Sequence, residues 1–106
     1  MDEVWLVICN APDCAIARTL AAQIIGAGAA ACVNIMSPCE SIYRWEGGVE
    51  TSNEIPLFIK TTRAKYPALE ALIRAHHPYD TPEIIALPLV AGLTAYLQWV
   101  AGEIRR

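Results

Sequence analysis

The stretch from His76 to Leu89 constrains this fold most, because the chain must end a helix and begin a strand within a few residues. Pro78 and Pro82 cannot continue a helix, since proline lacks an N–H group and restricts the residue before it. The apolar run that begins at Ile84 predicts a buried strand. Because the same stretch also holds both histidines of the chain, it is the first place to look for a functional site.

The remaining elements follow from apolar runs, which predict strands, and from apolar spacings of three and four, which predict helices. Asn10 can cap the first helix, Gly47-Gly48 predicts a hairpin turn, and Pro56 should sit at a sheet edge or bulge. The expected strands cover residues 4–9, 30–36 and 83–89, with a hairpin over 41–62; the expected helices cover 10–26, 64–77 and 93–104.

This order of elements, β-α-β-β-α-β-α, predicts an α+β fold. Its first six elements match the ferredoxin-like βαββαβ plan, an antiparallel four-stranded sheet with two helices on one face. The last helix is an extra C-terminal element. At 106 residues, the sequence predicts a single domain over residues 1–106.

The composition is rich in apolar residues for a small monomer, at 55% hydrophobic and 18% charged. It excludes disorder and favours an oligomer, although a tightly packed monomer is the alternative. The hairpin arms are also longer than a compact sheet needs. Strand edges left without a partner in the same chain could pair with a neighbouring subunit.

The net charge of −3 argues against nucleic acid and anionic membranes as partners, because both select basic surfaces. The opening residues, Met1-Asp2-Glu3, lack the positive region of a signal peptide. An uncharged segment from Thr19 to Cys39 contains polar residues, glycines and a proline, which favour a helix followed by a strand over a membrane span. Four cysteines without C-x-x-C spacing indicate reduced thiols and a cytoplasmic protein.

The ferredoxin-like plan brings the end of the first strand, the end of the second helix and the start of the last strand to one edge. Cys9, His76, His77 and Glu83 therefore meet at a common rim, and they are ligand types that late transition metals prefer. Each also has a structural alternative. His76 could pack in the core on its helix face, His77 could cap helix carbonyls, Cys9 could fill the core, and Glu83 could accept backbone hydrogen bonds.

Three bulky or charged residues lie near the hairpin tip: Tyr43, Trp45 and Glu46. They are either exposed strand residues or contacts to another subunit or a ligand. The size and aromatic character of the group favour an interface or ligand cleft.

Taken together, these segments resemble the CutA family of divalent-cation tolerance proteins. The matching pieces follow the family's order at residues 31–35, 41–47, 59–62, 76–84, 86–88 and 96–99. The resemblance implies a ferredoxin-like fold, a cytoplasmic homotrimer built like the PII signalling trimers, and a role in tolerance to divalent metal, chiefly copper. Other divalent metals such as zinc are alternatives to copper.

The family's copper ligands carry over onto Cys9, His76 and His77, with Glu83 as a weaker candidate. Cys14 and Cys39 lie outside the shared pattern. The leading prediction is thus a homotrimeric protein that binds divalent or transition metal, copper favoured.

Three other functions compete with metal binding. The first is a PII-like small-molecule sensor or scaffold with its ligand in the clefts between subunits. The second is an enzyme in which His76 or His77 activates Cys9 as a nucleophile. We expect no enzyme, because no nucleophile, base and orienting group can be assembled from the sequence. The third is an RNA binder, since RNA-recognition modules share the βαββαβ plan, but the acidic balance opposes it.

Overall fold

The computed structural model describes residues 2–105 as five strands and three helices. They are β1 (Val4–Ala11), α1 (Cys14–Gly26), β2 (Cys32–Ile35), β3 (Cys39–Trp45), β4 (Gly48–Thr62), α2 (Tyr66–His76), β5 (Ile84–Pro88) and α3 (Thr94–Glu103). The strand order is β2-β4-β1-β5, β3 also pairs with β4, and every pairing is antiparallel. The predicted α+β, ferredoxin-like plan is confirmed.

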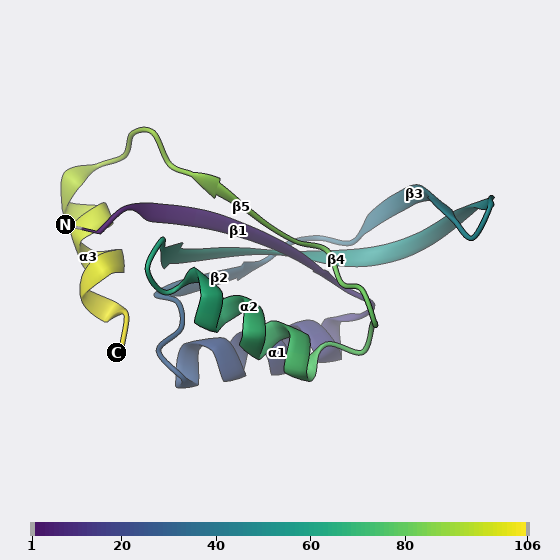
Figure 1. The fold of residues 1–106 in the computed structure, drawn as a ribbon, viewed down its shortest axis with the longest axis horizontal. Helices are drawn as coiled ribbons and strands as arrows, with labels where there is room; N and C mark the ends of the chain where they lie inside the picture. Colours follow the sequence, from purple (N-terminus) through teal and green to yellow (C-terminus); the bar gives the residue numbers. More distant parts are fainter. Residues whose placement is uncertain (1, 106) are drawn as a thin grey trace.

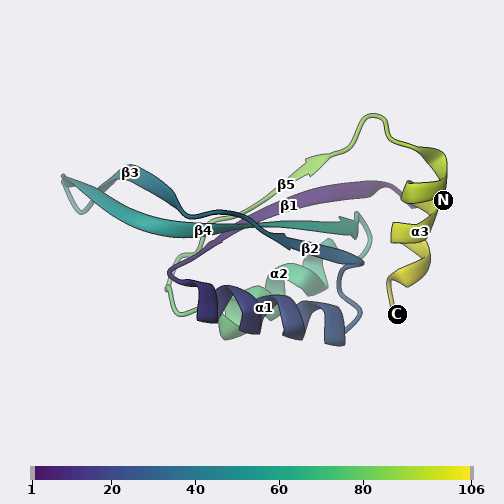
Figure 2. The same ribbon diagram turned by 180° about the vertical axis from the view of Figure 1, so that it is seen from behind.

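The molecule consists of a two-layered body and a projecting arm (Figure 1). In the body, α1 and α2 cover one face of the sheet, and α3 lies at the end of the sheet near the N-terminus. The arm consists of β3 and residues 48–53 of β4, and it extends past the opposite end of the sheet, as the view from behind also shows (Figure 2). The two ends of the molecule are therefore built differently.

One hydrophobic core joins the sheet to the two helices. Successive strand residues point to opposite faces, so the alternating residues Val7, Cys9 and Ala11 of β1 all face the helices and are buried. Leu20 of α1 and Leu69 of α2 pack against them. A single domain over the whole chain stays a prediction, because residues 1 and 106 lie outside the described part.

The start of α1 differs from the prediction. β1 continues through Asn10, which pairs with Pro56 of β4, so Asn10 cannot serve as the helix cap. Asp13 caps α1 instead, and its carboxylate accepts a hydrogen bond from the Ile16 N–H at 2.8 Å. The long partner strand explains the difference, because β4 offers ladder positions as far as Ala11.

The hairpin turn is shifted by one residue from the predicted Gly47-Gly48 pair. Trp45 pairs with Gly48, so Glu46 and Gly47 form the two-residue turn. Their φ angles are 49° and 80°. A tight turn with positive φ at both positions matches the right-handed twist of the flanking strands.

Pro56 lies inside β4 rather than on the outer edge of the sheet. Its carbonyl accepts a hydrogen bond from the Met36 N–H at 2.9 Å, at the break between β2 and β3. In an antiparallel strand the N–H and C=O of one residue point to the same side, so the N–H that proline lacks would face this break. Between the pairs Ile35–Leu57 and Cys39–Glu54, three residues face two residues of β4, so Pro56 lies at a bulge, as the sequence allowed.

The uncharged segment 19–39 forms the end of α1 and then β2, as predicted. Within residues 2–105, none of the helices combines the length and the apolar character that crossing a bilayer requires.

Candidate functional site

The predicted rim is present in the structure. Cys9 of β1 pairs with Ile84 of β5, the residue directly after Glu83. The His77 ring reaches the same end of β1, with its Nε2 atom 2.7 Å from the Asn10 carbonyl oxygen. Three segments distant in sequence therefore meet here, and the antiparallel β1–β5 pairing is what joins them.

Cys9 is a core residue, 1% exposed. Burial raises the pKa of the Cys9 thiol from its usual 9.0 to about 12, and the negative charges of Glu83 and Glu54 add to this effect. Its Sγ atom contacts the Asn10 carbonyl oxygen at 3.9 Å. A protonated, buried thiol is a poor nucleophile and a poor metal ligand, since both roles need the thiolate.

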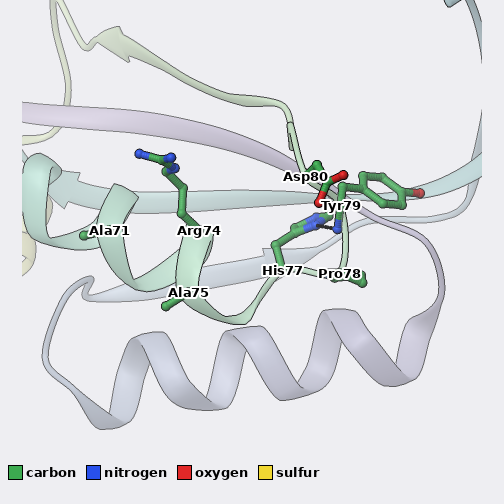
Figure 3. Close-up of a pocket in the computed structure, with 7 residues that line it drawn as sticks. All are labelled: Ala71, Arg74, Ala75, His77, Pro78, Tyr79 and Asp80. Atoms are coloured by element: carbon green, nitrogen blue, oxygen red, sulfur yellow. Dashed lines mark hydrogen bonds between the residues drawn. The ribbon is translucent and has the colours of Figure 1, made fainter.

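His77, rather than His76, is the buried histidine, at 7% exposed. Its Nε2–H donates to the Asn10 carbonyl, and its Nδ1 accepts from the Tyr79 N–H at 3.1 Å (Figure 3). A carbonyl only accepts and an amide N–H only donates, so these two partners fix the ring tautomer. The ring does not cap helix carbonyls as the alternative held, because it binds β1 instead. Both ring nitrogens are occupied, so His77 acts here as a structural clamp between α2 and β1.

His76 is exposed, which contradicts the alternative of a packed core histidine. Leu69 and Ile73 are the buried residues of α2, and the helix ends before a further buried position is reached. The His76 Nδ1 atom lies 3.4 Å from the Gln23 side-chain nitrogen of α1. His76 is thus the predicted ligand whose ring is most open to solvent.

The predicted metal ligands lie at one edge of the sheet, but their side chains do not converge on a common point. Among residues 2–105, no three His, Cys, Asp or Glu side chains are grouped so that they could hold a metal ion. Cys9 points into the core, His77 is held by two backbone groups, and His76 lies on the exposed side of α2. In this arrangement one chain does not form a three-ligand site.

A cavity of about 640 Å³ lies between the arm and the segment at residues 79–83. Two of the three predicted cleft residues, Tyr43 and Trp45, line it, and so does Glu83 from the predicted metal set. Glu46 lies in the hairpin turn and does not line it. The Tyr43 hydroxyl accepts a hydrogen bond from the Ser52 hydroxyl across the arm at 3.4 Å.

Sequence reasoning missed the other lining residues of this cavity, of which Glu54, Tyr79 and Asp80 are aromatic or charged. Tyr79 and Asp80 belong to the stretch from residue 76 to residue 89, so their place beside the two histidines was a usable signal. Glu54 carried no such signal, because only the pairing of β3 with β4 places it opposite Cys39 at the base of the arm.

A second cavity, of about 480 Å³, lies beside the last turn of α2 (Figure 3). Arg74, His77 and Asp80 supply its charged and polar groups. It shares Tyr79 and Asp80 with the larger cavity, so the segment after α2 separates the two.

The fold and the site define a class of protein: a ferredoxin-like chain with an extra C-terminal helix, a projecting arm and a polar rim at the base of that arm. The family described as CutA1 divalent ion tolerance protein matches this chain over residues 5–103. The chain therefore belongs to the CutA family, as the sequence resemblance predicted.

Individual relatives agree with this assignment. The Citrobacter koseri divalent-cation tolerance protein CutA is 40% identical over 105 residues, 99% of this chain and 91% of the relative. The crystal structure of CutA1 from Oryza sativa is 40% identical with a TM-score of 0.95, covering 98% of this chain and 95% of that one. CutA from Archaeoglobus fulgidus, described as a periplasmic divalent cation tolerance protein, is 31% identical with a TM-score of 0.93, covering 96% and 99%.

Proposed function

We propose that this protein is a cytoplasmic homotrimer that acts in tolerance to divalent cations and binds copper in preference to other metals. The observation that carries the proposal is the CutA match over residues 5–103, whose family description names divalent ion tolerance. The four free cysteines fit a reducing compartment. Because one relative is described as periplasmic, cell fractionation is the direct check of location.

Uncovered apolar surface at both ends of the molecule supports the trimer. On the arm, Ile42 is 68% exposed and Val49 is 65% exposed. At the opposite end, Val90 and Leu93 beside α3 are 99% and 75% exposed. Two different patches on one chain can cover each other in a head-to-tail contact, and a closed head-to-tail contact gives a ring. A ring of three is the state that the family resemblance implies.

The mass of the protein in solution tests the trimer. We expect sedimentation equilibrium at micromolar concentration to give three times the chain mass of 11.6 kDa. Ile42→Glu combined with Val49→Glu should dissociate the ring, because a charge cannot be buried unpaired at an interface. Glu50→Gln, also on the arm, is the matched control and should leave the mass unchanged. A monomer mass for the unaltered chain would contradict the proposal.

The proposed copper ligands are Cys9, His76 and His77, with Glu83 weaker. The structure ranks them: His76 is exposed, whereas His77 must give up a backbone hydrogen bond and Cys9 must lose a strongly held proton before either can bind. A site with three ligands therefore requires these groups to rearrange, or another subunit to complete it. Imidazole favours copper and zinc alike, and divalent affinity peaks at copper.

Calorimetric titration with Cu²⁺, with Zn²⁺ in parallel, tests the ligand set. We expect His76→Ala to weaken copper binding most and Cys9→Ser least. Binding should also weaken as the pH falls through about 6.5, the ordinary histidine pKa, because ligands must be deprotonated. Replacing Glu70, on the same helix, by Gln is the control. Unchanged copper affinity in both Cys9→Ser and the double alanine variant of His76 and His77 would rule out these ligands.

The cavity at the base of the arm favours a second function, that of a PII-like sensor or scaffold for a small molecule. Tyr43 and Trp45, predicted for such a cleft, line one cavity with Glu83, about 40 residues away in sequence. Its volume of about 640 Å³ falls within the range of about 300–1,000 Å³ typical of ligand sites.

A further inference from the structure

The cavity between the arm and residues 79–83 combines aromatic rings with carboxylates. The six residues that matter to its chemistry are Tyr43, Trp45, Glu54, Tyr79, Asp80 and Glu83. They come from β3, β4 and the segment after α2 of one chain.

The negative charge of this cavity is uncompensated. Among residues 2–105, no lysine, arginine or histidine lines it. Within residues 2–105, the only ion pair joins Arg63 to Glu3, so Glu54, Asp80 and Glu83 each lack a basic partner. Burial raises the pKa of the Tyr79 hydroxyl, and the negative charge of Glu54 adds to this effect. A recess lined by one sign of charge concentrates ions of the opposite sign.

The aromatic walls are held in place, and they are exposed in the single chain. Tyr79 is 38% exposed, and its ring lies against the His77 imidazole with centroids 4.7 Å apart. His77 in turn is fixed by the Asn10 carbonyl and by the Tyr79 N–H. Trp45 is 53% exposed, and the Tyr43 hydroxyl is bound to Ser52. The buried histidine is thus a positioning residue for one wall of the cavity.

Aromatic faces and carboxylates together select a particular ligand chemistry. A bare metal ion needs converging oxygen, nitrogen or sulfur ligands, and the described residues contain no such group of three. An organic cation uses both features, because its charge is attracted to carboxylates and to the faces of aromatic rings. A guanidinium suits them best, since it is planar, stacks on rings and binds carboxylates in a bidentate manner.

We infer that this cavity binds a small organic cation whose charge is carried by a guanidinium or alkylammonium group. The inference rests on the proposed sensing function and names its ligand class, and of the proposed copper ligands it uses only Glu83. Trp45 and Tyr79 supply ring faces, while Glu54 and Glu83 neutralise the charge.

Calorimetric titration of the native assembly with butylguanidinium tests this ligand class, and butylurea is its neutral isostere. We expect butylguanidinium to bind at least tenfold more tightly than butylurea, and to weaken as salt is added. Glu83→Gln and Glu54→Gln should each lower the affinity for butylguanidinium several-fold to tenfold. Glu40→Gln, an exposed change on β3 outside the cavity lining, is the matched control and should have no effect.

A pair of substitutions at Tyr79 separates the ring from the hydroxyl. Tyr79→Phe keeps the ring face and should retain binding, whereas Tyr79→Leu should lose most of it. Circular dichroism and the sedimentation mass of each variant confirm that it remains folded and assembled. If Tyr79→Leu does not fold, the isosteric variants Glu54→Gln and Glu83→Gln still test the inference.

Several results would overturn the inference. These are equal binding of butylurea and butylguanidinium, equal losses in Glu40→Gln and Glu83→Gln, or no binding of butylguanidinium to the native assembly. Tighter binding of butyl phosphate would overturn the cationic ligand while leaving a sensing function intact. The copper titration is a separate measurement, so its outcome cannot be confused with any of these.

Discussion

The body and the arm share one strand, β4, yet the two halves of that strand have opposite environments. In the body, Ile55, Leu57 and Ile59 are 5%, 0% and 0% exposed, whereas Val49 in the arm is 65% exposed. Both halves are strand sequence, although the arm half has only one apolar side chain, Val49. The difference is that α1 and α2 cover the sheet of the body and do not reach the arm (Figure 1). A strand pattern therefore tells which residues share a face, but not what covers that face.

This difference has an energetic consequence. Full burial of a valine or isoleucine side chain contributes about 1.5–3 kcal/mol of stability. In an isolated chain Ile42 and Val49 of the arm are mostly exposed, so they provide little of this stabilisation. The proposed association with a second copy would recover it, so the arm is expected to control assembly together with the apolar patch beside α3.

The largest expected contrast between buried and open positions is in thiol reactivity. A Cys9 pKa of about 12 instead of 9.0 lowers the thiolate fraction at neutral pH about 1,000-fold. We expect iodoacetamide to modify the exposed Cys14 and to leave Cys9 unmodified, as peptide mass spectrometry will show. In denaturant both should react at comparable rates. Rapid labelling of Cys9 in the folded protein would contradict its burial and revive the nucleophile hypothesis.

The raised pKa of Cys9 also predicts how the stability of the fold changes with pH. The folded chain holds the Cys9 proton more tightly than the unfolded chain does. Between pH 9 and 12 the unfolded state therefore carries fewer protons, and stability falls as the pH rises. Cys9→Ala should reduce this loss relative to the unaltered protein in urea unfolding at pH 8 and pH 11.

The next largest contrast is in the free energy of unfolding that is lost when one side chain is truncated in each half of β4. Leu57→Ala should lower the free energy of unfolding by about 2–5 kcal/mol, because it leaves a cavity in the core. Val49→Ala should cost less than about 0.5 kcal/mol in dilute protein, as a surface change does, and more at concentrations where the proposed trimer would form. Urea unfolding at several protein concentrations measures both. Equal losses at high dilution would remove the distinction between body and arm.

The smallest predicted effect compares two glycines. Gly47 in the arm turn has φ +80°, so Gly47→Ala should cost about 1–2 kcal/mol. Gly26 ends α1 in the body, and a Cβ added there would have no heavy atom within 4 Å. Gly26→Ala should therefore be neutral or stabilise by up to about 1 kcal/mol. Thermal unfolding of both variants gives the comparison, and a stabilising Gly47→Ala would show that the turn differs from the one described.

The order of strands and helices was determined by the sequence, and so was the meeting of β1, α2 and β5 at one rim. Local sequence patterns were sufficient for this prediction. The spacing of hydrophobic residues distinguishes a strand from a helix, and Pro78 and Pro82 prevent the helix from continuing. Membership of the CutA family was also readable, since the matching segments occur in order along nearly the whole chain.

Only the tertiary structure decided which adjacent histidine is buried. His77 lies just after α2 with extended backbone, at ψ 138°, so the period of the helix no longer sets the direction of its side chain. A carbonyl of β1, 67 residues away, determines its position instead. The cavity joining Tyr43 to Glu83 is decided in the same way, because side-chain convergence depends on how separate elements pack, and no local pattern encodes that.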